Sequence, residues 1–316
     1  MSRTAIIFLI VLFIALIFNV KQSSATDELT VILDWFVNPD HAPLIVANEA
    51  DFFSDVGLEV EFVAPSNPDD PPKLVAAGKA DLAISYQPQL HLQVDHGLPL
   101  MRIATVVASP LTTLIVLPGG PVADLADLKG RRIGYSVAFY KDLLLPAMLA
   151  RHGLTLQDVD TVAVSFALSQ ALLAGRVDAT IGAFRNFELN QMALAGHEGR
   201  AFFPEEEGVP AYDELIVVAN TASLGDSRLP AFLDALERGV QYLVNHPEES
   251  WRLFIGANPA LDDEINRRAW RDTLPRFALR PAALDGHRYD RFARFLHAQG
   301  LIARVPPVAD YARDVR

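Results

Sequence analysis

The sequence contains no cysteine. This excludes a disulfide-stapled scaffold, thiolate redox or metal chemistry, and a lipoprotein anchored through a processed N-terminal cysteine. Catalytic motifs are also lacking, because no HExxH, GxSxG, Walker or GxGxxG pattern occurs along the chain. The eight histidines are scattered without metal-ligand spacing. We therefore expect a binding protein rather than an enzyme, with no cofactor and no metal site.

Positive charge is scarce. The chain has 27 Lys and Arg against 39 Asp and Glu, which gives a formal net charge of −12. Nucleic-acid binding depends on neutralising phosphates, and attachment to anionic lipids depends on basic clusters. The composition therefore argues against both partners and leaves a small molecule as the expected ligand.

The N-terminus has the pattern of an export signal. Arg3 precedes an almost unbroken apolar run from Ala5 to Val20, and Ser23-Ser24-Ala25 offers small residues for a signal peptidase. The run is shorter than the ~20 residues that a spanning helix needs. We expect residues 1–25 to be a signal peptide cleaved after Ala25, leaving a periplasmic protein without direct membrane insertion. The alternative is an uncleaved anchor that tethers a ligand sensor.

Two stretches of the chain echo each other at residues 76–84 and 173–181. Each passes from an apolar helix through a glycine, a cation and an aspartate into an apolar strand. Glycine suits the left-handed position at a helix C-terminus, and a cation suits the negative end of the helix dipole. The repetition predicts two similar α/β lobes with a ligand cleft between them. The alternative is chance, because helix–glycine–strand junctions are common in α/β proteins.

Alternating strands and helices indicate largely parallel sheets covered on both faces. We expect apolar strands at residues 111–117 and 215–219 to carry the chain out of the first lobe and back into it. Lobe 1 should then comprise residues 26–112 and 214–316, including a helical C-terminal part, and lobe 2 residues 113–213. In such sheets, binding groups gather at the carboxyl ends of the strands.

Polar and aromatic residues cluster at four of these expected strand ends. The first cluster contains Asp34, Trp35, Asn38 and His41, with Asp40 placed to cap the following helix. The indole of Trp35 offers a flat face for a heteroaromatic ring. The other candidate binding residues follow later strands: Ser85, Tyr86, Tyr135, Asn186 and Glu188.

Glu188 should face Asp34 across the cleft. A pair of carboxylates favours a ligand rich in N–H donors, such as an aminopyrimidine, because each can accept charge-assisted hydrogen bonds. The alternative is that Glu188 pairs with Arg185 on the surface.

The stretch Leu33–His41, which reads LDWxxNxxH, and the GLxVxF stretch at Gly57–Phe62 resemble the thiamine-pyrimidine binding proteins called ThiY. The similarity spans most of the chain. It implies a type II periplasmic binding protein fold and delivery of hydroxymethylpyrimidine or formylaminopyrimidine to an ABC permease and its ATPase. It also implies that Trp35 stacks on the pyrimidine, that Asn38 and His41 line the same wall, and that Glu188 anchors the ligand from the second lobe.

A eukaryotic relative of this family is a pyrimidine synthase that consumes its own histidine and uses pyridoxal phosphate and iron. His41 falls at the position of that histidine, but Val37 stands where the synthase has its cofactor lysine, and the cysteine-rich iron motif has no counterpart. A synthase-like enzyme therefore remains only as the alternative function. Other branches bind riboflavin, sulfonates or nitrate, and a sulfonate site would require a cation rather than two acids.

Overall fold

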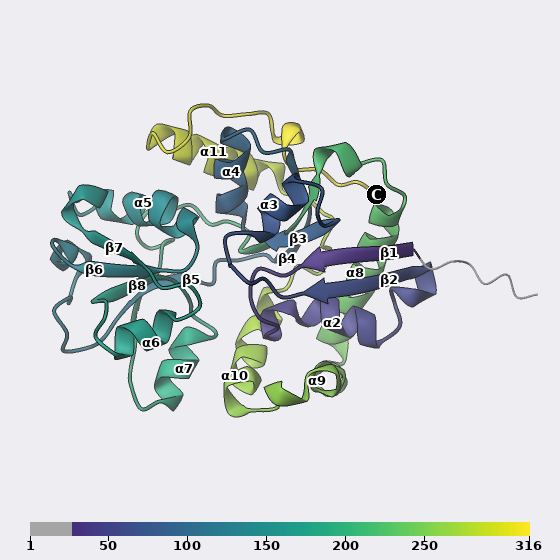
Figure 1. Ribbon diagram of the computed structural model, residues 1–316, viewed down its shortest axis with the longest axis horizontal. Coiled ribbons are helices and arrows are strands. Elements are labelled where there is room, and N and C mark those ends of the chain that lie inside the picture. The colour runs from purple at the N-terminus through teal and green to yellow at the C-terminus, as the bar shows by residue number, and fades with distance from the viewer. Residues whose placement is uncertain (1–26) are drawn as a thin grey trace, which may run out of the picture.

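The computed structural model describes residues 27–316, which form two α/β lobes side by side (Figure 1). The expected export signal at residues 1–25 lies outside the described residues. Within residues 27–316, no helix combines the length and the apolar character needed to cross a bilayer.

The first sheet has the strand order β2-β1-β3-β10-β4. Its strands are β1 (Asp27–Ile32), β2 (Leu58–Val63), β3 (Leu82–Ser85), β4 (Leu100–Val107) and β10 (Leu215–Asn220). Strand β1 pairs in parallel with β2 and β3, whereas β10 runs antiparallel to β3 and β4. We call this sheet and the helices packed on it lobe 1.

The second sheet repeats that arrangement in the order β7-β6-β8-β5-β9. Its strands are β5 (Thr112–Val116), β6 (Arg132–Tyr135), β7 (Asp160–Ala163), β8 (Ala179–Phe184) and β9 (Arg200–Phe202). Again one strand, β5, runs antiparallel between its neighbours. This sheet with its helices is lobe 2. In each sheet the antiparallel strand enters from the other lobe, which confirms the expected two-lobed α/β class and the two crossover strands.

The helices cover both faces of the sheets (Figure 1). Helix α10 of lobe 1 packs against α7 of lobe 2. The short edge strand β9 was not expected from the sequence, whereas helix α11 belongs to the expected helical C-terminal part. The α-helices are α2 (Ala42–Glu49), α3 (Pro71–Ala76), α4 (Gln87–Asp95), α5 (Leu145–Ala150), α6 (Leu168–Leu173), α7 (Glu188–Leu194), α8 (Arg228–Asn245), α9 (Pro247–Ala257), α10 (Glu264–Thr273) and α11 (Gly286–Ala298).

The two echoing stretches occupy equivalent places in the two sheets. Their glycines adopt the expected left-handed conformation, with φ of +67° at Gly78 and +66° at Gly175. Asp81 then accepts a hydrogen bond from the backbone N–H of Thr30 over 2.9 Å. Asp178 accepts the matching bond from the N–H of Arg132, also over 2.9 Å. The echo therefore has a structural basis, because each aspartate ties its loop to the neighbouring parallel strand of its own sheet.

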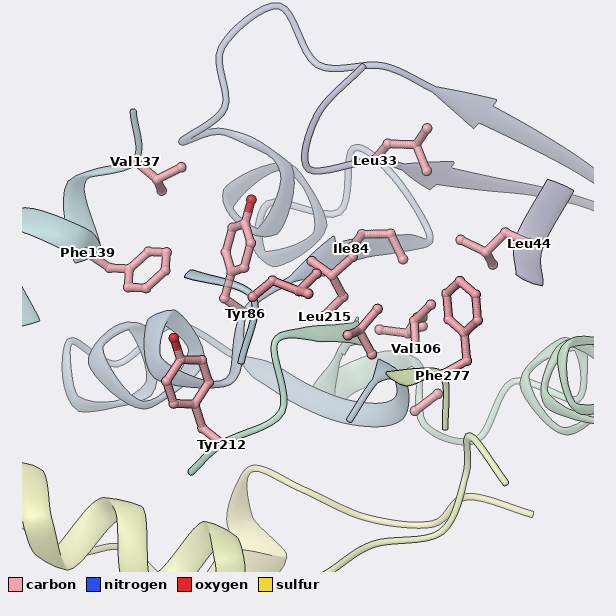
Figure 2. Close-up of a cluster of buried hydrophobic side chains, with 14 of the residues drawn as sticks. Leu33, Leu44, Ile84, Tyr86, Val106, Val137, Phe139, Tyr212, Leu215 and Phe277 are labelled. Carbon is pink, nitrogen blue, oxygen red and sulfur yellow. The ribbon is translucent and has the colours of Figure 1, made fainter. Parts of the chain in front are cut away.

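A hydrophobic core runs without interruption from one lobe to the other beneath the cleft. Figure 2 shows Tyr86 of lobe 1 between Phe139 of lobe 2 on one side and Ile84 on the other. The ring centroids of Tyr86 and Phe139 are 5.1 Å apart. Burying apolar surface contributes about 25 cal/mol per Å². This shared core thus holds the lobes together at the base of the cleft.

A buried glutamate joins the two crossover segments. Glu214, just before β10, accepts hydrogen bonds from the N–H groups of Leu111 and Thr112 over 2.5 and 2.9 Å and from the Thr112 hydroxyl over 2.9 Å. Burial raises the pKa of Glu214 to about 7, against these stabilising bonds. The carboxyl therefore links the outgoing and returning crossover segments.

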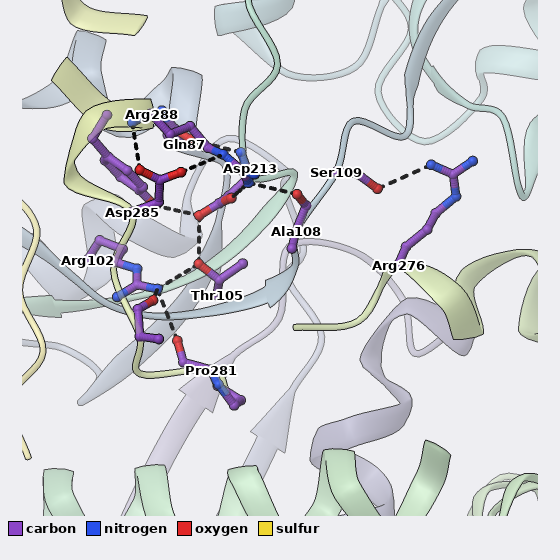
Figure 3. Close-up of polar contacts among 12 residues, drawn as sticks. Gln87, Arg102, Thr105, Ala108, Ser109, Asp213, Arg276, Pro281, Asp285 and Arg288 are labelled. Atoms are coloured by element: carbon purple, nitrogen blue, oxygen red, sulfur yellow. Dashed lines mark hydrogen bonds and ion pairs between the residues drawn. The ribbon is translucent and has the colours of Figure 1, made fainter. Parts of the chain in front are cut away.

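Beside it, Asp213 forms the centre of a second polar network (Figure 3). Its carboxylate accepts hydrogen bonds from Thr105 Oγ1 over 2.7 Å and from the guanidinium of Arg288. Arg102, which is fully buried, in turn donates to Thr105 and to backbone carbonyls that include that of Pro281. These bonds fix the returning crossover against β4 and α11.

Candidate functional site

A pocket lies between the lobes and takes its walls from both. It encloses about 370 Å³ of empty space, counting its opening. Its side chains come mainly from segments that follow strands β1, β3, β6 and β8. The lining residues are Asp34, Trp35, Asn38, Asp40, Tyr86, Ser136, Tyr140, Leu168, Gly182, Phe184, Phe187 and Glu188.

Of the nine binding residues predicted from the sequence, five line this pocket: Asp34, Trp35, Asn38, Tyr86 and Glu188. The other four, which are His41, Ser85, Tyr135 and Asn186, are not among the lining residues. Ser85 is fully buried and donates to Gln89 within its own lobe. Tyr135 is half-buried, with the Lys141 ammonium 5.7 Å from its ring centroid.

Asp34 is held from two sides. Its Oδ2 accepts a hydrogen bond from the Tyr86 hydroxyl over 2.7 Å, and its Oδ1 lies 2.8 Å from His41 Nε2. Because His41 Nδ1 accepts the Asn38 N–H over 3.3 Å, the ring proton resides on Nε2, which donates to Asp34. His41 thus supports the pocket wall from behind, and Asp34 is positioned by its neighbours before any ligand arrives.

The turn after β1 is organised by Asn38 rather than by Asp40. The Asn38 side chain accepts the Asp40 N–H over 2.8 Å and so caps the 3₁₀ turn at Pro39–His41. The expectation that Asp40 caps the following helix is wrong, because helix α2 has no side-chain cap. The carboxyl of Asp40 instead lines the pocket.

Asp40 and Glu188 are the two acids that approach each other across the pocket. Burial raises the pKa of Asp40 to about 6, against hydrogen bonds from Thr273 and Asn186. Burial also raises the pKa of Glu188 to about 7, and the nearby charge of Asp40 adds to this rise. Burial therefore disfavours the ionised forms of both acids, and a ligand that donates N–H groups to them would stabilise those forms.

Glu188 lies at the first position of α7, where its Oε2 accepts the Phe184 N–H over 2.6 Å. This contact orients the carboxyl toward the pocket and leaves its other oxygen for a ligand. The alternative that Glu188 pairs with Arg185 is wrong. Arg185 instead forms a two-pronged pair with Glu205, with N–O distances of 2.7 and 3.0 Å.

Tyr140 forms the floor of the pocket through an unusual turn. Residues Tyr140–Leu144 form a π-helical turn in which the Leu145 N–H bonds to the Tyr140 carbonyl. Pro146 has no N–H to continue a regular α-helix at this point. The Tyr140 ring packs on Gly182, where an added Cβ would lie 2.5 Å from Tyr140 Cδ2 and where φ is +92°. Only glycine fits at this position.

The cleft is closed by direct contacts between the lobes. Asn186 Nδ2 of lobe 2 donates to Asp40 Oδ1 and to Thr273 Oγ1 of lobe 1, both over 2.6 Å. At a second point, Asn190 Nδ2 donates to Asp272 Oδ2 over 2.8 Å. On the far side, Asp69 accepts the N–H of Ala138 over 2.9 Å. Asp69 therefore bridges the lobes.

Sequence reasoning missed seven lining residues: Asp40, Ser136, Tyr140, Leu168, Gly182, Phe184 and Phe187. Ser136 and Phe187 lie in segments that follow expected strands, where binding groups were predicted to gather. The sequence therefore indicated the segments but not these particular residues. Tyr140 carried no such signal, because its position depends on the π-helical turn.

Three acids, Asp34, Asp40 and Glu188, line the pocket. None of the described residues that line it has a basic side chain. Such a site can accept hydrogen bonds from N–H groups or bind a cation, and it repels anions. In the same part of the chain, no three His, Asp or Glu side chains are grouped to hold a metal ion.

The sequence pattern of the family described as NMT1/THI5 like matches residues 38–250. A Haemophilus influenzae protein named for thiamine biosynthesis is 50% identical over 93% of this chain and 94% of its own length. The formylaminopyrimidine-binding protein of Halalkalibacterium halodurans is 35% identical over 74% of this chain and 72% of its own. A 4-amino-5-hydroxymethyl-2-methylpyrimidine phosphate synthase of Uromyces fabae is 29% identical over 77% of this chain and 74% of its own.

Among solved structures, the alkanesulfonate-binding protein SsuA from Xanthomonas axonopodis pv. citri superposes with a TM-score of 0.70 at 18% identity. The match covers 91% of this chain and 98% of the other. It confirms the expected periplasmic binding protein-like fold. At this identity the likeness concerns the fold alone.

Proposed function

Because this chain belongs to the NMT1/THI5-like family, we propose that it is the binding component of an importer and that it closes around an aminopyrimidine of thiamine metabolism. The candidate ligands are hydroxymethylpyrimidine and formylaminopyrimidine. The observation that carries the proposal is the meeting of the Trp35 indole with the carboxyls of Asp40 and Glu188 in one pocket between the lobes.

Each part of this pocket suits one feature of an aminopyrimidine. The indole of Trp35 offers a face for stacking on the flat ring. Glu188 has one oxygen engaged by the Phe184 N–H, and the other can accept the exocyclic amine or a protonated ring nitrogen. Asp34 and Asp40 complete an acidic wall that favours donors over anions.

Binding would draw on the closure of the two lobes. We propose that residues 27–112 with 214–316, and residues 113–213, rotate about the crossover segments beside Glu214. A ligand that contacts both lobes stabilises the closed form and so shifts the population toward it. The closed protein would then deliver the ligand to an ABC permease and its ATPase in the periplasm.

The non-catalytic role is part of the proposal, since relatives at lower identity are named as synthases. The synthase resemblance directs attention to His41. In this structure His41 is 1% exposed, its two ring nitrogens are bonded to Asn38 and Asp34, and it is not among the pocket-lining residues. These contacts support a structural role for the imidazole.

The test is titration of ligand-free protein with hydroxymethylpyrimidine, formylaminopyrimidine and riboflavin, followed by mass analysis of the recovered ligand. We expect saturable quenching of tryptophan fluorescence by the aminopyrimidines and recovery of unchanged ligand. Trp35→Phe should abolish the quench. The matched control Trp251→Phe should keep it, because Trp251 packs against Trp270 and is not among the pocket-lining residues.

Three results would reject the proposal. The first is that neither aminopyrimidine binds saturably. The second is that riboflavin binds more tightly than both aminopyrimidines. The third is that the protein converts the ligand chemically.

A further inference from the structure

A second hollow continues outward from the inner pocket. We call it the outer chamber. It shares Trp35, Asn38, Leu168, Phe187 and Glu188 with the inner pocket and encloses about 720 Å³ of empty space, counting its mouth. A single substituted pyrimidine in the inner pocket would leave this second space unfilled.

Two buried polar groups of the outer chamber lack a partner. Ser169 is 3% exposed and Asn266 is 4% exposed, and both line the chamber. Within residues 27–316, neither Ser169 Oγ nor Asn266 Oδ1 makes a hydrogen bond. The other side-chain atom of Asn266, Nδ2, donates to Asp263 over 2.9 Å, which fixes the orientation of the amide. Unsatisfied buried polar groups are rare, and one explanation is a ligand that supplies the missing partner.

Aromatic side chains from both lobes form a wall of the chamber. Phe166 of lobe 2 lies with its ring centroid 4.5 Å from that of Trp35 and 4.6 Å from that of Phe36. Ser165, directly before Phe166, has a φ of +49°, a conformation that a serine adopts only when its surroundings impose it. Phe36 is 52% exposed, so part of this aromatic wall has no cover.

The charge of the chamber has one sign. Among the described residues that line it, Glu188 is the one ionisable side chain, and the inner pocket adds two more acids. Aromatic faces attract cations through the negative potential of their rings. An aromatic wall beside carboxylates is therefore suited to a flat cation and unsuited to a phosphate or sulfonate.

We propose that the outer chamber is a second ligand subsite, which receives a positively charged heteroaromatic ring joined by a short linker to the aminopyrimidine in the inner pocket. The inference rests on the proposed function, because the inner pocket sets where the linker begins. The second ring would pack against Trp35 and Phe166, and a donor on one of its substituents would bind Ser169 Oγ, which is covered in the free protein and would turn toward the chamber on binding. The preferred ligand is then a two-ring compound.

The probes are thiamine, which joins an aminopyrimidine to a thiazolium cation, and hydroxymethylpyrimidine, which lacks the second ring. Calorimetric titration of the full-length mature protein should give thiamine an affinity at least about tenfold higher, equivalent to about 1.4 kcal/mol. If hydroxymethylpyrimidine binds and thiamine binds more weakly, the second subsite is rejected and the proposed function stands. If neither binds, the proposed function itself fails.

A pair of charge variants tests the location. Gln170 is exposed and lines the outer chamber but not the inner pocket. Gln170→Lys should lower thiamine affinity about three- to tenfold, whereas the matched Gln170→Glu should preserve or raise it. Both variants should leave hydroxymethylpyrimidine affinity within about twofold, because that probe lacks the cationic ring.

Ser169→Ala adds a readout independent of charge. Removal of an unpaired buried hydroxyl should leave the melting temperature of the free protein unchanged or higher. It should nevertheless weaken thiamine binding and spare hydroxymethylpyrimidine. Equal effects of the Gln170 or Ser169 changes on both probes would overturn the second subsite.

Discussion

Asn186 of lobe 2 donates a 2.6 Å hydrogen bond to the carboxyl of Asp40 of lobe 1, and this bond closes the cleft beside the pocket. The same amide nitrogen reaches Thr273, so one side chain joins the second lobe to two elements of the first. Asn186 was predicted from the sequence as a ligand contact. Its geometry instead suits a residue that retains the ligand by holding the lobes together.

Asn186→Ala should therefore accelerate ligand release. Loss of hydrogen bonds to a buried carboxyl costs about 1.5–3 kcal/mol, which corresponds to roughly a tenfold or larger rise in the dissociation rate if closure limits release. Stopped-flow tryptophan fluorescence measures this rate. The control is Asn190→Ala, which removes the more exposed interlobe contact with Asp272 and should change the rate by less than about threefold. Equal dissociation rates in wild type and Asn186→Ala would show that Asn186 does not hold the lobes closed on the ligand.

Glu188→Gln should weaken aminopyrimidine binding by about 1.5–3 kcal/mol, because the ligand would lose a charge-assisted hydrogen bond. Isothermal titration calorimetry measures the change. Glu205→Gln is the matched control, since Glu205 pairs with Arg185 and does not line the pocket. An unchanged affinity of the Glu188 variant would remove this residue from the binding site.

Ligand affinity should rise with pH between about 5 and 7.5. The raised pKa values of Asp40, about 6, and Glu188, about 7, mean that the free closed pocket holds protons in this range. A ligand that donates N–H groups binds the ionised carboxyls and lowers these pKa values, so binding releases protons. Above about pH 7.5 the carboxyls are ionised in both states and the affinity levels off.

Titration of the wild type and of Glu188→Gln over this pH range isolates the contribution of the carboxyl. Protonation of the ligand in free solution affects both proteins alike, so the difference between the two profiles belongs to Glu188 and its contact with the ligand. Calorimetry in two buffers of different ionisation enthalpy gives the number of protons released. Parallel profiles in the two proteins would show that Glu188 does not titrate on binding.

Gly182→Ala should disrupt the pocket floor. The added Cβ would lie 2.5 Å from the Tyr140 ring, at a backbone φ of +92°. We expect the free energy of unfolding to fall by about 2–4 kcal/mol, from overpacking and backbone strain together. Gly175→Ala is the control, because Gly175 also has a positive φ of +66° but open space around it. Its cost should be about 1 kcal/mol, measured by urea denaturation. Equal losses in the two variants would exclude the Tyr140 contact as the cause.

The sequence predicted the fold well because its signals are local. Alternating strands and helices and the repeated glycine–aspartate junction each follow from nearby residues. Asp81 and Asp178 confirm that the echo reflects equivalent positions in two sheets. Trp35 and Glu188 were found by one rule, since each follows a strand whose carboxyl end faces the cleft.

The remaining features of the site depend on contacts distant in sequence. Asp40 looked like a helix cap, but helix α2 has no side-chain cap and the Asp40 carboxyl lines the pocket. Its second partner, Thr273, lies more than two hundred positions along the chain. The place of Tyr140 depends on a π-helical turn and on Gly182 of another strand. No local pattern reports such pairings.

The most direct measurement is a crystal structure of the protein with hydroxymethylpyrimidine. The account predicts that the pyrimidine stacks on Trp35 and that its exocyclic amine lies about 2.7–3.1 Å from a carboxyl oxygen of Glu188, with the lobes closed. Ligand density elsewhere, with Trp35 and Glu188 lining an unfilled cleft, would contradict it.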